Sequence, residues 1–487
     1  MTATGGAGVA ETHSAVVFFV GDRAYKLKKP VDLGFLDFRE RAAREAVCRR
    51  EVALNRRLAP DVYLGVADVS GPDGEVCDHL VVMRRMPPDR RLSTLVAEGH
   101  PVEDHLWALA HLLAAFHARA ERSDAADAAA SPGALAGRWS DNTASLAAHA
   151  GVVDPATVER VQALAMRYLE GRRPLFRRRI AEGRACDGHG DLLADDVFLL
   201  DDGPRVLDCI EFDDGLRYGD TLADVAFLAM DLERLGRPDL AERFLRAYRE
   251  HADDTWPASL EHHHVAYRAQ VRAKVTAIRA AQGHGEAVPE ARRLLGTALR
   301  HLEAGRVRLV LVGGLPGTGK STLARALGDA LGATVLRSDE MRKELAGIPA
   351  DRHAPDAFGQ GIYSATATAD TYGELVRRAE VALGMGETVV LDASWNEERW
   401  RERARAAAVR VHADLVELRC AAPAEVAAAR IRARTAAGDD VSDASPAVAA
   451  AMAVRADPWP AAVTISTEGA PSVTVATALD AVSAGAP

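Results

Sequence analysis

Apolar and polar residues alternate along the start of this 487-residue chain in a way that predicts strands and one helix. A Gly21-Asp22 turn between the first two apolar runs predicts a hairpin, and 38–58 repeats apolar residues at helical spacing. The pattern as a whole predicts a small β-rich lobe. Its predicted strands are 15–20, 24–28, 62–69 and 79–83.

From about residue 102 the spacing of apolar residues becomes helical, with many alanines. Two short strands, at 197–200 and 205–208, interrupt the helical pattern. A β-rich lobe followed by a larger helical lobe outlines a bilobal α+β domain. The predicted helices are 104–121, 155–182, 222–251 and 258–283.

Helices and strands alternate in the last third of the chain, which implies βαβ units and a parallel sheet flanked by helices. Residues 284–304 contain Gly, Pro and a short helical stretch, and we expect a connector there. The predicted strands are 307–313, 333–337, 387–392, 411–419 and 461–466. The expected domain limits are 1–95 for the β-rich lobe, 96–283 for the helical lobe, 284–304 for the connector and 305–487 for the α/β domain.

Composition narrows the class of protein. Hydrophobic residues make up 48% and charged residues 27%, as in globular proteins, and no apolar stretch approaches the roughly 18 to 20 residues that span a bilayer. The N-terminus shows no secretory pattern and the five cysteines are scattered, so we expect a cytoplasmic protein without disulfides or zinc. A net charge of −10 does not favour nucleic acid as a partner, and no motif indicates an oligomeric state.

A phosphate-binding loop follows the strand predicted at 307–313. Its sequence fits G-x-x-x-x-G-K-[ST] and leads into a helical pattern. In such a loop the glycines let backbone N–H groups surround a triphosphate, while Lys320 reaches the outer phosphates and the Ser321 hydroxyl ligates Mg²⁺. We therefore expect ATP and Mg²⁺ as cofactors. The residues predicted to bind them are Gly314, Pro316, Gly317, Thr318, Gly319, Lys320, Ser321 and Thr322.

Lysine is rare in this chain, since only six of the 60 basic residues are lysine and 54 are arginine. A position that keeps lysine is therefore informative, and Lys320 is one of the six. The cluster Lys26, Lys28 and Lys29 indicates a second phosphate-handling site, with a chance surface patch as the alternative.

Two further segments complete the predicted loop site. The strand 388–392 ends in Asp392, the Walker B position that holds Mg²⁺, and the next residue is Ala393. Because ATPases that activate water commonly have Glu at that next position, the alanine favours transfer to a hydroxyl over hydrolysis. Asp339, after the second strand, is the candidate catalytic base; the alternative is that it only caps a helix beginning at Glu340.

A helix predicted at 424–435 carries Arg430 and Arg434 four residues apart, on one face. This segment resembles the mobile lid of nucleoside monophosphate and gluconate-type kinases, and the domain resembles the P-loop kinases that include zeta-toxin-type kinases. The resemblance implies that both arginines neutralise charge on the transferring phosphoryl group. A solvated arginine face is the alternative.

Asp191, in the sequence His-Gly-Asp, is followed five residues later by Asp196 and, at the end of a short strand, by Asp208. Kinases use such parts to hold a hydroxyl and two Mg²⁺ ions. The pattern resembles the aminoglycoside phosphotransferase family, H-G-D-x-x-x-x-N followed by an I-D strand. The resemblance implies that Asp191 orients or deprotonates the acceptor hydroxyl and that Asp196 and Asp208 hold metal. It also implies that the acidic segment 217–224 braces the catalytic loop.

The same resemblance makes Lys26 the lysine that contacts the nucleotide's phosphates and Glu51 its ion-pair partner, with Glu45 as the second choice. The chain departs from the family in three ways. Aspartate stands where the family has asparagine at Asp196, Leu193 stands where a second histidine is common, and no Gly-rich loop precedes Val16.

The predicted fold is an α+β bilobal kinase-like N-terminal domain plus an α/β P-loop kinase domain with a parallel sheet flanked by helices. The predicted activity is ATP-dependent transfer of the γ-phosphate to a hydroxyl of a small polar molecule such as a sugar, aminosugar or antibiotic. The alternative is an ATP-binding regulatory or stress module in which the P-loop domain gates a degenerate kinase-like domain. A third hypothesis is phosphorylation of nucleic-acid ends, which the negative net charge of the chain disfavours.

Overall fold

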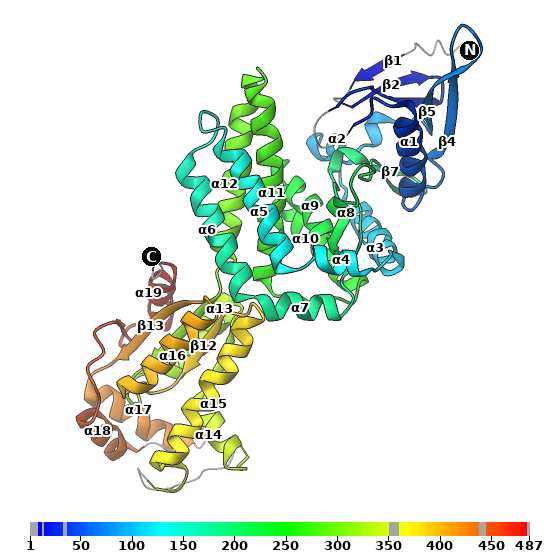
Figure 1. The fold of residues 1–487 in the computed structure, drawn as a ribbon. Helices are drawn as coiled ribbons and strands as arrows, with labels where there is room; N and C mark the ends of the chain where they lie inside the picture. The colour runs from blue at the N-terminus through cyan, green and yellow to red at the C-terminus, as the bar shows by residue number, and fades with distance from the viewer. Residues whose placement is uncertain (1–7, 12–13, 33–36, 350–359, 438–444, 485–487) are drawn as a thin grey trace. The chain divides into compact units, whose positions relative to one another are not determined.

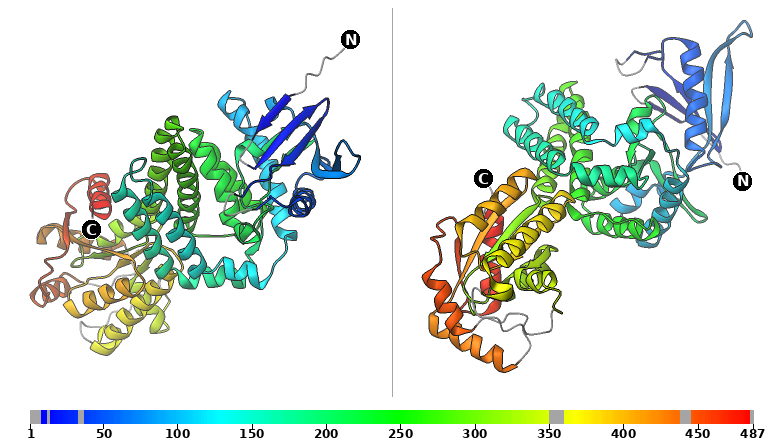
Figure 2. Two further views of the ribbon diagram at one scale, coloured as in Figure 1. Left: turned by 45° about the horizontal axis from the view of Figure 1, so that its top comes forward. Right: turned by 60° about the horizontal axis from the view of Figure 1, so that its bottom comes forward.

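The computed structural model describes residues 8–11, 14–32, 37–349, 360–437 and 445–484, without the side chains of 434–437. By its internal contacts the chain forms two compact units, which are described separately here. The first unit contains 1–162, 176–256 and 261–301, and the second contains 163–175, 257–260 and 302–487. Figures 1 and 2 show the course of the chain. The predicted domain limits stay a prediction.

The first unit begins with an antiparallel sheet of order β1-β2-β3-β5-β4. The predicted hairpin is confirmed, because Ala15 pairs with Lys28 and Val20 with Arg23. Strand β1, which pairs with β2, was not predicted. Helix α1 packs on the sheet through Cys48 and Val52 (Figure 1). The elements are β1 (Gly8–Glu11), β2 (Ala15–Val20), β3 (Arg23–Lys28), α1 (Arg41–Asn55), β4 (Tyr63–Ser70) and β5 (Val76–Arg84).

Helices form the rest of the first unit. They are η1 (Pro88–Arg90), α2 (Leu92–Ala97), α3 (Glu103–Arg119), α4 (Asp124–Ala129), α5 (Pro132–Ala147), α6 (Pro155–Gly171), α7 (Arg173–Ala181), α8 (Asp214–Arg217), α9 (Thr221–Arg234), α10 (Pro238–His251), α11 (Ala258–Ala281), η3 (Gly285–Ala287) and α12 (Val288–Ala304), of which α6, α7, α11 and α12 extend into segments of the second unit. Short ladders lie among them: β6 (Ala185–Asp187) with β9 (Tyr218–Asp220), and β7 (Val197–Leu200), which follows η2 (Ala194–Asp196), with β8 (Gly203–Val206).

Three helical predictions need correction. The stretches 155–182 and 222–251 each form two helices, because a glycine and a proline interrupt them; Gly236, with φ +82°, and Pro238 separate α9 from α10. Most of the predicted connector is a 17-residue helix, α12. Its apolar stripe, which includes Ala291, Leu295 and Ala298, is buried at helical spacing.

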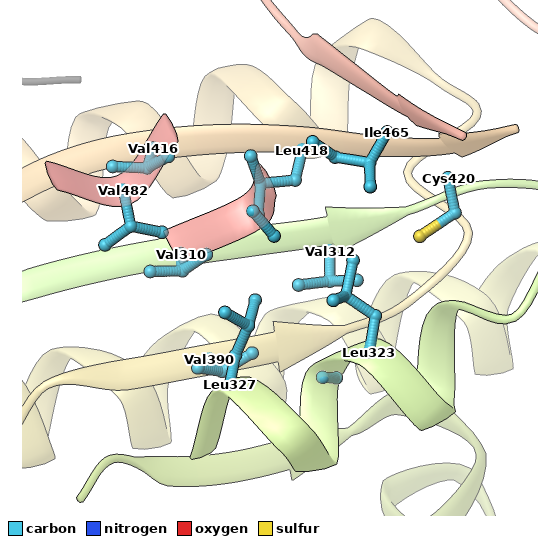
Figure 3. Packing of buried hydrophobic residues seen from close by; sticks show 12 residues of the cluster. Val310, Val312, Leu323, Leu327, Val390, Val416, Leu418, Cys420, Ile465 and Val482 are labelled. Atoms are coloured by element: carbon cyan, nitrogen blue, oxygen red, sulfur yellow. The ribbon is translucent and has the colours of Figure 1, made fainter. Parts of the chain in front are cut away.

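The second unit contains a parallel sheet of order β11-β12-β10-β13-β14, as predicted. Residues 309–313 of β10 are all buried, on both faces of the sheet. This explains why the strand is a continuous apolar run. On one face Val310 and Val312 contact Leu323 and Leu327 of α13 (Figure 3). The elements are β10 (Arg308–Gly313), α13 (Lys320–Leu331), β11 (Thr334–Arg337), α14 (Ser338–Leu345), η4 (Gly361–Tyr363), α15 (Ala365–Gly384), β12 (Val389–Asp392), α16 (Glu398–Arg410), β13 (Asp414–Ala421), α17 (Ala424–Ala437), α18 (Pro446–Val454), β14 (Val463–Ser466) and α19 (Pro471–Ala484).

The order of the strands places the phosphate-binding loop at the edge of the sheet where ligands of such sheets bind. After β10 the chain crosses to β11 and β12 on one side, and then to β13 and β14 on the other. Ligands of such sheets bind at the carboxyl ends of the strands where this direction reverses. The loop 314–319 leaves β10 at that point. Within the described ranges, no helix is both long and apolar enough to cross a membrane.

Candidate active sites

The loop of the first unit that was predicted to be catalytic lies between β6 and β7 and is fixed by a buried carboxylate. Asp224 of α9 accepts hydrogen bonds from the backbone N–H groups of His189 (2.7 Å) and Gly190 (2.8 Å), and lies 3.1 Å from His117 Nε2. Gly190 adopts φ +91°, where a Cβ would lie 3.1 Å from the Leu216 carbonyl oxygen. The acidic segment therefore braces the loop, as the sequence resemblance implied.

Lys26 joins the two lobes of the first unit through its ammonium group. Its Nζ lies 2.9 Å from Glu51 Oε1 of α1 and 2.7 Å from Asp208 Oδ1, after β8. Burial acts to lower the pKa of Lys26, but the charges of Asp208 and Glu51 outweigh it and hold that pKa well above its usual range. Glu45, the second choice for this partner, instead pairs with Arg49 at 2.8 Å.

A second buried lysine, Lys28, extends this cluster; it was predicted only as one of the clustered lysines, without a role of its own. Lys28 Nζ lies 2.6 Å from Glu51 Oε2 and 2.5 Å from Glu211 Oε1, and its side chain is 1% exposed. The signal was present in the sequence, because residues two apart on a strand share a face. Lys26 and Lys28 therefore both face α1, while Lys29 pairs with the exposed Glu11.

Asp191 lines a cavity of about 570 Å³ in the first unit. Burial raises the pKa of its carboxyl to about 6, although Arg272 and Arg268 act in the opposite direction. A carboxylate with such a pKa is better suited to accept a proton near neutral pH than an ordinary aspartate. Its place on the cavity wall and its raised pKa are compatible with the role of base that the resemblance implied.

Asp196 and Asp208 are the two carboxylates that the sequence resemblance assigns to Mg²⁺. Burial and the charges of Asp208 and Asp191 raise the pKa of Asp196 well above its usual range, while Lys26 lowers that of Asp208. Asp208 has an exposed side chain and a left-handed backbone, φ +64°. No group of three metal-ligating side chains occurs among the described residues, but Mg²⁺ in kinases needs only one or two carboxylates besides phosphates and water.

The phosphate-binding loop of the second unit has the backbone that its sequence predicts. Gly317 and Gly319 adopt φ +81° and +85°, and Lys320 begins α13. A Cβ on Gly317 would lie 2.4 Å from the Ala427 carbonyl oxygen, and one on Gly314 would lie 2.7 Å from that of Cys420. The loop therefore packs closely against neighbouring backbone, with Pro316 and Thr318 buried and Thr322 exposed.

Asp392, at the end of β12, offers a free oxygen in the second unit. Its Oδ2 accepts a hydrogen bond from Arg337 Nε at 3.2 Å, whereas its Oδ1 is buried and has no hydrogen-bond partner among the described side chains and backbone. A buried carboxylate oxygen without a partner is costly unless a ligand satisfies it. This oxygen and the Ser321 hydroxyl on the first turn of α13 suit the Mg²⁺ that accompanies a triphosphate.

The remaining predicted residues lie around this loop. Arg430 donates to the Thr467 carbonyl oxygen (2.7 Å), and the Thr467 hydroxyl donates to the carbonyl oxygen of Thr318 in the loop (2.8 Å). The side chain of Arg434 lies outside the described residues. Asp339 lies in the first turn of α14, which begins at Ser338, so the alternative that it caps a helix beginning at Glu340 is wrong.

The fold and the two sites define a class of protein: a kinase-like α+β phosphotransferase domain joined to a P-loop kinase domain. The model of the phosphotransferase enzyme family matches residues 8–262, and a family described as AAA domain matches 309–459. The chain belongs to the phosphotransferase enzyme family.

Full-length relatives exist in mycobacteria. Uncharacterized proteins of Mycobacterium tuberculosis and Mycobacterium bovis are 46% identical over 462 residues, which is 95% of this chain and 92% of theirs. Among solved structures, a choline/ethanolamine kinase family protein of Mesorhizobium loti is 16% identical, covers 61% of this chain and 92% of its own, and has a TM-score of 0.36. A gluconokinase of Sinorhizobium meliloti is 18% identical over 37% of this chain and 91% of its own, with a TM-score of 0.27.

Proposed function

We propose that the first unit transfers the γ-phosphoryl group of ATP to a hydroxyl of a small polar molecule, such as a sugar. One observation carries the proposal: the Lys26 ammonium lies between Glu51 and Asp208, and Asp191, on the loop that precedes Asp208 in the chain, faces a cavity. A phosphate-contacting lysine, metal-holding carboxylates and a base beside an empty space are the parts that phosphoryl transfer requires.

Each residue has a defined task in this proposal. Lys26 contacts the phosphates, and Asp196 and Asp208 hold Mg²⁺, which neutralises charge on the phosphates when bound. The acceptor's hydroxyl oxygen forms a bond to the γ-phosphorus while the bond to the β,γ-bridging oxygen breaks, so ADP leaves. Asp191 orients that hydroxyl and takes its proton.

The second unit is proposed as a separate ATP and Mg²⁺ site. The unpartnered Asp392 Oδ1 and the tightly packed loop before Lys320 support this assignment. Asp339 is the proposed base if this unit also phosphorylates a hydroxyl, with Arg430 and Arg434 as charge-neutralising groups. The roles of these residues stay predictions.

Transfer of label from [γ-³²P]ATP tests the proposed function. The protein is incubated with Mg²⁺ and a panel of sugars, sugar acids, amino sugars and aminoglycosides, and labelled products are separated from ATP. We expect at least one labelled acceptor, and a loss of at least about 100-fold in Asp208→Asn, because a metal-holding carboxylate is removed.

Asp202→Asn is the matched control, because Asp202 is an exposed aspartate of the same lobe that pairs with Arg205 at 3.0 Å. We expect this variant to label the acceptor like the wild type. If the wild type labels no acceptor, or if Asp208→Asn equals Asp202→Asn, the proposal is wrong. The regulatory alternative, an ATP-binding module with a degenerate first unit, would then be favoured.

A further inference from the structure

The cavity beside Asp191 has a mixed apolar and cationic lining. Helix α11 presents one face to it at helical spacing, so that Arg268, Arg272 and Val275 all line the space. Phe227 and Leu135 add apolar surface from α9 and α5. An acceptor that occupies this cavity must therefore suit both cations and apolar surface.

Three cations of the cavity are held in place by neutral oxygens, whereas a fourth, Arg217, pairs with Asp187. Arg268 donates to the carbonyl oxygens of Ala223 (2.9 Å) and Gly190 (3.1 Å), and Arg138 of α5 donates to that of Gly215 (2.9 Å). Lys274 donates to Asn142 Oδ1 at 2.7 Å. These contacts fix the positions of the three charges and leave them without a carboxylate within ion-pair distance.

Arg272 also lines the cavity and makes no hydrogen bond or ion pair with any described residue. It lies close enough to Asp191 to lower the pKa of that carboxyl. Burial lowers the pKa of Arg268, a desolvation cost that the charges of Asp224 and Asp191 offset only in part. An anion in the cavity would remove that cost.

Two buried arginines of the first unit are paired with carboxylates, and one of them, Arg217, lines the same cavity. Arg179 lies 2.5 Å from Asp220 and 3.0 Å from Asp254, and Arg217 lies 2.7 Å from Asp187. Arg268 and Arg272 therefore differ from Arg179 and Arg217, because neither has a carboxylate within ion-pair distance among the described residues.

The aspartates of the cavity wall do not cancel these charges. Asp220 is paired with Arg179, and Asp224 lies 3.1 Å from His117 and accepts hydrogen bonds from the N–H groups of His189 and Gly190. Asp141 and Asp213 are exposed, and Asp213 already accepts the Gly215 N–H at 2.8 Å. Apart from Asp191, the buried carboxylates that line the cavity therefore already have hydrogen-bond or ion-pair partners.

We propose that the acceptor of the first unit is an anion: a hydroxyl compound that carries a carboxylate, phosphate or sulfate group held by Arg268 and Arg272. The phosphorylation of the hydroxyl rests on the proposed function, whereas the binding of the anion does not depend on it. Arginine matches such oxyanions with paired N–H donors. A cationic aminoglycoside would meet like charges in this cavity.

Binding without turnover tests the inference. Both nucleotide sites are saturated with AMP-PNP and Mg²⁺, and calorimetry measures the affinity of four matched hexoses: glucose, glucosamine, glucuronate and glucose 6-phosphate. We expect at least one anionic hexose to bind about tenfold or more tightly than glucose and glucosamine. In Arg272→Glu that preference should disappear, because the charge facing the anion is reversed.

Arg279→Glu is the matched control, since Arg279 lies on the same helix, is exposed and pairs with Glu286 at 3.5 Å. It should keep the preference of the wild type. The inference is overturned if neither anionic hexose binds, if glucosamine binds most tightly, or if Arg272→Glu behaves like Arg279→Glu. If an anion binds as expected but no acceptor is labelled by ATP, the anion site stands and the proposed transfer fails.

Discussion

The two candidate ATP sites of this chain are built in opposite ways. In the first unit, side chains from three separate parts of the chain meet, with Lys26 and Lys28 facing Glu51, Asp208 and Glu211. In the second unit, one continuous segment supplies backbone N–H groups, and its glycines take conformations that other residues avoid.

This difference predicts how each site fails. A cluster of buried, mutually paired charges fails when one charge is removed, because its partners stay buried without compensation. A backbone loop fails when a single methyl group is added where the chain passes close to other backbone. The predictions below test this contrast, from the largest expected effect to the smallest.

Lys28→Met should destabilise the first unit by about 3–5 kcal/mol, because Glu51 is fully buried and Glu211 nearly so beside the lost ammonium. Unfolding in urea, followed by tryptophan fluorescence, measures the change. Lys29→Met is the control: its side chain is 22% exposed and its partner Glu11 is exposed, so we expect a change of at most about 1 kcal/mol. Equal effects of the two variants would contradict the contrast.

Two histidines of the first unit should lose their contribution to its stability in mild acid. Burial lowers the pKa of His264 from 6.5 to about 4, and that of His262 to about 4 as well. Between about pH 6.5 and pH 4 the unfolded chain therefore binds protons that the folded chain does not. The contribution of the two histidines is fully present above that range and is lost as the pH falls through it, by up to about 3 kcal/mol for each histidine.

His264→Phe isolates this effect, because both ring nitrogens of His264 are buried and lack hydrogen-bond partners within the described part of the chain. We expect its unfolding free energy to depend less on pH between 6.5 and 4 than that of the wild type. His284→Phe, at an exposed histidine, should keep the wild-type slope. A slope in His264→Phe equal to that of the wild type would show that His264 is not buried in its neutral form.

Gly317→Ala should weaken nucleotide binding at the second unit by about tenfold or more, since its Cβ would lie 2.4 Å from the Ala427 carbonyl oxygen. Titration with Mg·AMP-PNP in a Lys26→Met background reads this site alone. Gly332→Ala separates crowding from backbone strain, because Gly332 has φ +58° and open space around it. Equal losses in both variants would mean that close packing of the loop is unimportant.

The same contrast explains what could be predicted from the sequence. The residues of the loop site are close together in the sequence, so the strand, the glycines and the helix were predicted together. The parallel sheet was predicted from the alternation of helices and strands along the chain. The first site depends on tertiary contacts. Lys26, Glu51 and Asp208 were identified by resemblance, whereas Glu211 and Lys28 were not, because no short spacing links residues 183 positions apart. The cations of α11 were missed for the same reason: nothing local shows that they face Asp191.

The central claim is that phosphoryl transfer takes place at Asp191 in the first unit. The most direct measurement is kcat for an acceptor labelled by the wild type, compared between Asp191→Asn and Asp339→Asn, the candidate base of the second unit. Asp191→Asn should lower kcat by at least about 100-fold, while Asp339→Asn should stay within about twofold of the wild type. A large loss in Asp339→Asn with normal turnover in Asp191→Asn would contradict the claim.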